Sequence, residues 1–266
     1  MKCFTGIHIT QTHVHAEMVS ENYAAIRTHQ IAVDDAFATQ EGLLGTLAKV
    51  AKAIDPSGKS VAYGLSIPAT ISRWEGVLRS VPTFPQWEGC HLKEELEARI
   101  HGHVLMDSDA NCTLAGEWLT GEAGRHQDII AFLGDNHIRA SLLMHGHLWR
   151  GGQGMAGTIA SARSGTGRTL GETMSEQDGS EEKRSALATA IGTVAGNLVN
   201  TLDIRTILIA GSLAAFTEGL RTTLIKAATE ATHPALRKGL TLIAGSDNPR
   251  SAIIGAAFNW QLQPHD

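Results

Sequence analysis

The sequence lacks the features of a membrane, secreted or nucleic-acid-binding chain. Its longest apolar run, near residues 207–216, is too short to span a bilayer, and no long apolar segment follows Met1 as in a signal peptide. No run of Lys and Arg occurs, and the net charge of −5 disfavours an autonomous nucleic-acid binder. We therefore expect a cytoplasmic protein with neither a nucleic-acid nor a membrane partner.

Cysteine and charge are also scarce. The three cysteines, Cys3, Cys90 and Cys112, are too few and too widely spaced for a disulfide framework or a zinc motif. Histidines occur in spaced pairs such as His13 and His15, but no third ligand is spaced to complete a metal site. Charged residues make up only 18% while glycines number 28, which favours a compact, loop-rich, enzyme-like protein. We expect a reduced protein without zinc.

The first part of the chain predicts a βββαβα order. Alternating apolar and polar residues predict a three-stranded antiparallel meander, and apolar residues at helical spacing follow it. The predicted strands are residues 3–10, 12–19, 23–33 and 61–67, and the predicted helices are 43–54 and 91–100.

A second copy of this order follows. Its predicted strands are residues 128–133, 138–144, 148–150, 205–210 and 240–244, and its predicted helices are 187–202, 217–230 and a final one that starts near Pro249. A repeated order suggests two similar lobes, the architecture of the actin-like ATPase and ribonuclease H-like fold. We expect lobes at residues 1–115 and 116–266, with helix 249–260 packing back on the first. Residues 161–185, rich in Gly, Ser and Thr, predict a mobile loop.

One stretch after the predicted helix 91–100 contains the candidate catalytic residues. A short apolar run ends at Asp107, Ser108 and Asp109, and a helix-forming run begins there. A carboxylate at the carboxyl end of a strand lies where open α/β sheets bind ligands, so Asp109 is a candidate general base. The same three residues also fit a helix cap, and this stretch alone leaves both interpretations open.

Over nearly its whole length the chain resembles the ROK family of repressors, open reading frames and kinases. The stretch from Ser108 to Glu117 is similar to the family's Asn-Asp-Ala-Asn segment, and further matching segments occur in the family's order. They are Gly146–Gly151, Ala156–Gly157, Asn197–Asn200, Ile207–Ser212 and Ile254–Ala257. The resemblance is nearest to N-acylhexosamine kinases, including N-acetylmannosamine kinases. It implies the ROK sugar-kinase type of fold, a sugar ligand and a homodimer.

Site residues follow from the same resemblance. Asp109 matches the base that takes a proton from the sugar hydroxyl, and Ser108, Asn111 and Glu117 are the implied substrate-binding residues. The implied cofactor-binding residues lie at two strand ends. They are Gly134, Asp135, Gly211 and Ser212.

Both phosphate loops depart from the family. Asp-x-Gly-Gly-Thr is replaced by His8–Thr12, where the side chains of Thr10 and Gln11 should obstruct phosphate. Gly-Thr-Gly-x-Gly is replaced by Gly134–Ile138, where only Gly134 remains. A carboxylate at Asp135 facing a phosphate at ~4 Å would cost ~4 kcal/mol at an effective dielectric constant of ~20.

A third departure follows Gly157, where Thr158–Ser161 replaces the family's sugar-contacting Glu/His-x-Gly-His, and the zinc loop is absent. We therefore expect a degenerate homologue, a pseudokinase with impaired phosphoryl transfer that acts through ligand or partner binding. The alternative is an active kinase of a hexose or N-acylhexosamine that uses Mg-ATP, with Asp109 as base, Asn111 near the sugar and Asp135 recruited to magnesium. A repressor is disfavoured because the meander begins at residue 3.

Overall fold

The computed structural model describes residues 2–72, 75–165 and 167–262. It divides into two compact units. Unit 1 comprises Met1–Thr120, Arg150–Met155 and Pro249–Asp266, and unit 2 comprises Gly121–Trp149 and Ala156–Asn248. The boundary expected after residue 115 falls inside a helix that belongs wholly to unit 1, and the last helix belongs to the same unit.

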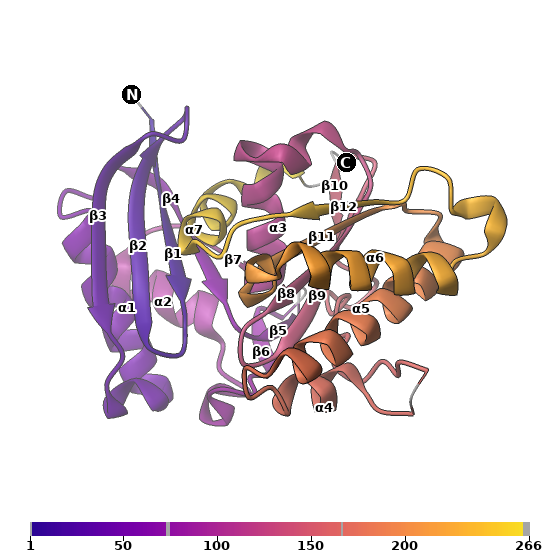
Figure 1. Cartoon of the computed structure of the whole chain (residues 1–266). Helices are drawn as coiled ribbons and strands as arrows, with labels where there is room; N and C mark the ends of the chain where they lie inside the picture. The colour runs from indigo at the N-terminus through magenta and orange to yellow at the C-terminus, as the bar shows by residue number, and fades with distance from the viewer. Residues whose placement is uncertain (1, 73–74, 166, 263–266) are drawn as a thin grey trace. The chain divides into compact units, whose positions relative to one another are not determined.

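Unit 1 is built on a five-stranded sheet with the order β3-β2-β1-β4-β7 (Figure 1). The predicted meander is confirmed, because β1, β2 and β3 pair antiparallel, whereas β4 and β7 run parallel to β1. The strands are β1 (Cys3–Ile9), β2 (His13–Ser20), β3 (Ala25–Ala32), β4 (Ser60–Ile67) and β7 (Val104–Ser108).

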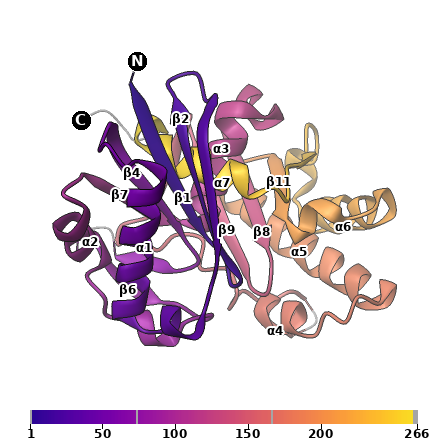
Figure 2. The same ribbon diagram turned by 90° about the vertical axis from the view of Figure 1, so that its left-hand side faces the viewer.

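Helices cover both faces of this sheet (Figures 1 and 2). One face packs against α1 (Gln40–Ile54) and α2 (Leu92–Ile100), and the other against α3 (Asp109–Thr120) and α7 (Pro249–Phe258). The segment between β4 and α2 contains a short hairpin and a 3-10 turn. Its elements are β5 (Thr70–Ser72), β6 (Val77–Ser80) and η2 (Pro85–Trp87). Two further 3-10 turns are η1 (Asp35–Ala38) and η6 (Asn259–Leu262).

Helix α7 lies unusually close to the sheet because glycines face it. A Cβ at Gly6 would lie 2.1 Å from the carbonyl oxygen of Ile253, and one at Gly64 would lie 1.9 Å from that of Ala256. Any larger residue there would force helix and sheet apart, so these glycines fix the depth at which α7 packs.

Unit 2 repeats the strand arrangement of unit 1. Its sheet has the order β10-β9-β8-β11-β12, again an antiparallel meander extended by two parallel strands, which confirms the repeated order. The strands are β8 (Ile129–Gly134), β9 (Ile138–Met144), β10 (His147–Trp149), β11 (Thr206–Gly211) and β12 (Thr241–Ala244). The helices are α4 (Leu170–Ser175), α5 (Glu181–Leu202) and α6 (Glu218–Ala231), with 3-10 turns η3 (Glu122–Arg125), η4 (Ser212–Ala215) and η5 (Pro234–Leu236). Apolar residues of α5 and α6 form the core with the sheet.

The expected loop at 161–185 contains a helix instead. Helix α4 starts with a capping box, in which the Thr169 side chain accepts the Glu172 amide and the Glu172 carboxylate accepts the Thr169 amide. These reciprocal bonds satisfy two otherwise unpaired donors and allow a six-residue helix in a segment rich in turn formers.

Candidate functional site

The carboxyl ends of the parallel strands of unit 1 bring polar residues into one row. In the strand register His8 of β1 lies opposite Ser66 of β4, and Ser66 lies opposite Asp107 of β7. Asp109 follows directly as the first residue of α3 and is only 2% exposed. The helix is capped by Ser108, whose hydroxyl oxygen accepts the N–H of Asn111 at 3.3 Å. The Asp109 Oδ1 accepts the N–H of the adjacent Ala110 at 2.8 Å, so the capping and general-base interpretations concern different residues.

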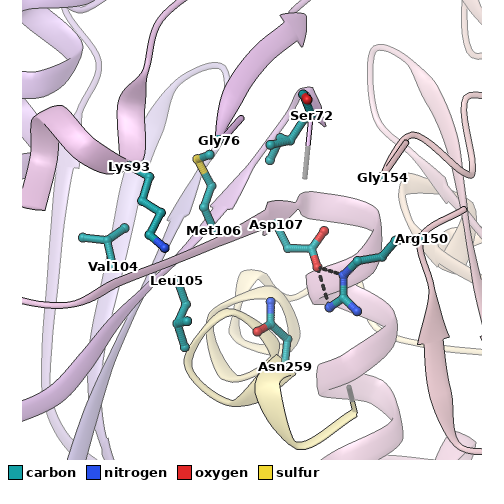
Figure 3. Close-up of a pocket in the computed structure, with 11 residues that line it drawn as sticks. Ser72, Gly76, Lys93, Val104, Leu105, Met106, Asp107, Arg150, Gly154 and Asn259 are labelled. Carbon is teal, nitrogen blue, oxygen red and sulfur yellow. Dashed lines mark hydrogen bonds and ion pairs between the residues drawn. The ribbon is translucent and has the colours of Figure 1, made fainter. Parts of the chain in front are cut away.

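Asp107 is the electrostatic centre of this row (Figure 3). Its Oδ2 accepts a hydrogen bond from Nε of Arg150 at 2.7 Å and forms an ion pair with Nη2 of the same guanidinium at 2.7 Å. Its Oδ1 accepts hydrogen bonds from the Asn111 side chain at 2.7 Å and the Ser108 amide at 2.8 Å. Asp107 and Arg150 are each 7% exposed. Charge-assisted bonds inside a low-dielectric interior are strong, and they fix the end of β7 next to Asp109.

Sequence reasoning missed this pair. It gave Asp107 only a possible capping role, and it noted Arg150 only as part of a matching segment. The available signal was an arginine directly before the two glycines Gly151 and Gly152.

Only some of the predicted substrate-binding residues lie close together. Ser108, Asp109 and Asn111 share the first turn of α3, whereas Glu117 lies about 12 Å further along the helix at 1.5 Å per residue. Glu117 is buried and its Oε1 accepts the Ser251 hydroxyl at 2.7 Å, a bond that ties α3 to α7. The amide of Asn111 supports Asp107. Asn111 and Glu117 therefore have scaffold contacts that account for their burial.

The turn between β1 and β2, where the family has its first phosphate loop, is held by hydrogen bonds within the chain. The Thr10 hydroxyl accepts the N–H of His13 at 3.0 Å and of Thr12 at 3.4 Å, and the Thr10 N–H donates to the His13 carbonyl at 2.9 Å. A phosphate cradle requires successive N–H groups that point outward. In this turn the N–H groups of Thr12 and His13 donate to the Thr10 hydroxyl, and the N–H of Thr10 donates to the His13 carbonyl.

Three histidines, His8, His13 and His15, lie next to this turn. The His8 ring is hydrogen-bonded to the Ser66 hydroxyl at 2.8 Å and stacks on His15 with ring centroids 6.4 Å apart. Burial, and then the neighbouring His13, lower the pKa of His15 from its ordinary value. Protonation of His15 is thereby disfavoured near neutral pH, which weakens this cluster as an anion site.

The second loop, at the end of β8 in unit 2, is also closed on itself. Asp135 Oδ1 accepts the His137 amide at 2.7 Å, and Oδ2 forms an ion pair with Arg139 at 2.8 Å. The expected repulsion from an uncompensated Asp135 therefore needs correction, since Arg139 offsets its charge. Both carboxylate oxygens of Asp135 therefore have partners within the loop and the following strand.

Gly134 and Gly211 lie side by side at the ends of β8 and β11. A Cβ at Gly211, whose φ is +63°, would lie 2.3 Å from the Gly134 carbonyl oxygen, and one at Gly134 would lie 2.7 Å from the Leu213 side chain. Ser212 begins the 3-10 turn η4. The predicted cofactor-binding residues thus share one sheet edge of unit 2, and strand packing alone accounts for both glycines.

The cysteines are structural. Cys3, Cys90 and Cys112 are free and buried. Burial raises the pKa of the Cys90 thiol to about 11 and that of Cys112 well above its ordinary value, so neither is a ready nucleophile. Within residues 2–72, 75–165 and 167–262, no group of three or more His, Cys, Asp or Glu is arranged to hold a metal. Within the same ranges no helix combines the length and apolarity needed to cross a membrane.

Comparisons with known proteins point to one family. Residues 4–164 match the model of the ROK family. A glucokinase of Thermotoga maritima is 26% identical over 176 residues, which cover 65% of this chain and 51% of that protein. A ROK family glucokinase from Streptomyces griseus, solved with glucose and AMPPNP, superposes with a TM-score of 0.80 at 16% identity and covers 96% of this chain and 98% of that one. A Listeria monocytogenes protein provisionally assigned as an N-acetylmannosamine kinase gives 0.76 at 21% identity, with 97% and 98% covered.

These matches confirm the expected actin-like ATPase fold of ROK sugar kinases. The chain spans about half the length of the curated glucokinases it matches. The sequence identities to these solved structures lie below 25%, so the superpositions establish the fold and not the activity.

Proposed function

Because the chain belongs to the ROK family, we propose that it is a sugar-kinase homologue with degenerate phosphate loops that binds a sugar without efficient phosphorylation. The observation that carries this proposal is the Thr10 turn, in which backbone N–H groups are engaged within the chain. Phosphoryl transfer depends almost wholly on positioning and charge stabilisation of the phosphates. A retained base cannot compensate for a lost cradle.

The residues around Asp109 support the part of the proposal that concerns sugar binding. Asp109 is retained at the β7–α3 junction, and the Asp107–Arg150 pair holds that junction in place. A carboxylate beside Ser108 can accept a hydrogen bond from a sugar hydroxyl whether or not phosphate follows. We therefore expect a hexose or N-acylhexosamine ligand, and by analogy with the family a homodimer, which light scattering can test.

The alternative remains an active kinase that uses Mg-ATP. Retention of Asp109 favours it, since this residue would deprotonate the sugar hydroxyl, with Asn111 near the sugar and Asp135 near magnesium. The contacts of Asn111 with Asp107 and of Asp135 with Arg139 weigh against those two roles.

Restoration of the family loops tests the proposal. One variant carries His8→Asp, Thr10→Gly and Gln11→Gly, and a second adds Asp135→Thr and Asn136→Gly. We expect calorimetry to find at least tenfold tighter Mg-ATP binding in the second variant than in the wild type, with glucose or N-acetylmannosamine binding unchanged. Equal Mg-ATP affinity in the wild type and the second variant would contradict the proposal.

A further inference from the structure

A separate polar pocket lies within unit 1 beside β7 (Figure 3). It has a volume of about 140 Å³, and its polar lining includes Ser72, Lys93, Asp107, Arg150 and Asn259. Ser108 and Asp109, the residues of the candidate catalytic end, are not among its lining residues. Leu105 and Met106 contribute apolar surface along the strand.

The charged side chains that line this pocket carry a net charge of one positive unit. Asp107 and Arg150 neutralise each other in their ion pair. Lys93 of α2 forms no ion pair with any residue of the described part of the chain, and its side chain extends to the pocket (Figure 3). A pocket with two cations and one carboxylate favours an anionic occupant.

Asn259 supplies an independent sign of a ligand. Its side chain is only 3% exposed, lines the pocket from η6 and makes no hydrogen bond to any other described residue. In the view of Figure 3 its amide lies between the Lys93 ammonium and the Asp107 carboxylate. Buried amides are almost always hydrogen-bonded, because desolvation without a partner is costly. This amide is positioned to give one hydrogen bond and accept another within the pocket.

We propose that this pocket binds a small hydroxylated anion, in which a carboxylate or phosphate group is attached to a short polyol chain. Lys93 pairs with the anionic group, Asn259 binds a hydroxyl, and Leu105 and Met106 contact the carbon chain. A dry cavity of about 150 Å³ holds a molecule the size of benzene, so an occupant of about six or seven heavy atoms fits. Glycerate has this size and chemistry.

The proposal goes beyond sugar binding at Asp109 and is tested separately. The probes are glycerate, hydroxymethylphosphonate and neutral glycerol, each of about six or seven heavy atoms and each titrated by ligand-observed NMR against the full chain. Glycerate or hydroxymethylphosphonate should bind and glycerol should not, and the tighter-binding anion identifies whether the pocket prefers a carboxylate or a phosphorus oxyanion. The matched variants are Lys93→Gln and the near-isosteric Asn259→Asp, with Lys49→Gln on α1 as the control.

We expect Lys93→Gln to weaken binding about tenfold, the size of one charge-assisted hydrogen bond. Asn259→Asp should abolish binding because it adds a negative charge to a small pocket that must hold an anion, and Lys49→Gln should change nothing. Lys93 is partly exposed, so its variant should fold even if the Asn259 variant does not. The proposal is wrong if neither anion binds, if glycerol binds equally well, or if Lys93→Gln and Lys49→Gln bind alike.

Discussion

Replacement of Arg150 by Met should destabilise the protein strongly. Arg150 donates one hydrogen bond from Nε to Oδ2 of Asp107 and forms an ion pair with the same oxygen through Nη2, and both side chains are almost completely buried. The substitution preserves most of the side-chain volume but leaves the Asp107 carboxylate buried without its cation. The remaining bonds from Asn111 and the Ser108 amide would stabilise that charge only in part.

Breaking one side of a buried ion pair typically costs about 3–5 kcal/mol. Since Asp107 retains two donors, we expect the lower end, about 3 kcal/mol, which is a large part of the roughly 5–15 kcal/mol that stabilises a typical domain. Asp107→Asn with Arg150→Met removes both charges and should be much less destabilising than the single Arg150 variant.

Urea denaturation followed by circular dichroism measures these differences as shifts of the midpoint at constant slope. The double-mutant cycle should give a coupling free energy of about 2 kcal/mol between the two residues. If the double variant loses as much stability as the two single variants combined, the pair is not coupled and the reasoning fails.

Three further predictions concern packing and protonation in unit 1. Gly255→Ala would place Cβ 1.7 Å from the Cys112 carbonyl oxygen and should lower the free energy of unfolding by at least about 1–3 kcal/mol. Gly45→Ala, with nothing within 4 Å of the added Cβ, should stabilise α1 by about 0.5–1 kcal/mol. Thermal unfolding in which Gly255→Ala is as stable as Gly45→Ala would contradict this packing. Burial raises the pKa of Asp55, but hydrogen bonds from two backbone amides and the Tyr63 hydroxyl outweigh it, so the folded pKa lies below the ordinary value. The stability advantage of wild type over Asp55→Asn should therefore be full above about pH 4 and decline as pH falls through the folded pKa; a pH-independent difference in urea midpoints would refute this. The Cys112 thiol, buried with a raised pKa, should react with a thiol reagent only as fast as the protein unfolds, and rapid native-state labelling would count against the buried site.

The elements that the sequence predicted well are those with local signals. Alternation over β1 to β3 and helical spacing over α1 and α5 involve neighbouring residues, so both copies of the meander were predictable. Helix α4 was missed because it is only six residues long, so its two buried apolar residues, Leu170 and Met174, show no repeating helical pattern, and the paired caps of Thr169 and Glu172 help to stabilise it.

Long-range pairing limits what a single sequence reveals about the site. The junction of β7 and α3 was predictable because a carboxylate follows an apolar strand, and Asp109 lies there. The partner of Asp107 was not, since Arg150 is 43 residues away and only the folded chain brings them together. Asp135 was identified as a loop residue, but its pairing with Arg139 depends on the turn geometry between β8 and β9.

Phosphorylation by the wild type tests the central claim most directly. Purified protein should be assayed with Mg-ATP and either glucose or N-acetylmannosamine, beside Asp109→Ala as the control that removes the candidate base. The degenerate loops predict no turnover of either sugar above the Asp109→Ala background and no measurable heat of Mg-ATP binding. Robust sugar phosphorylation by the wild type that disappears in Asp109→Ala would contradict the account and identify an active kinase.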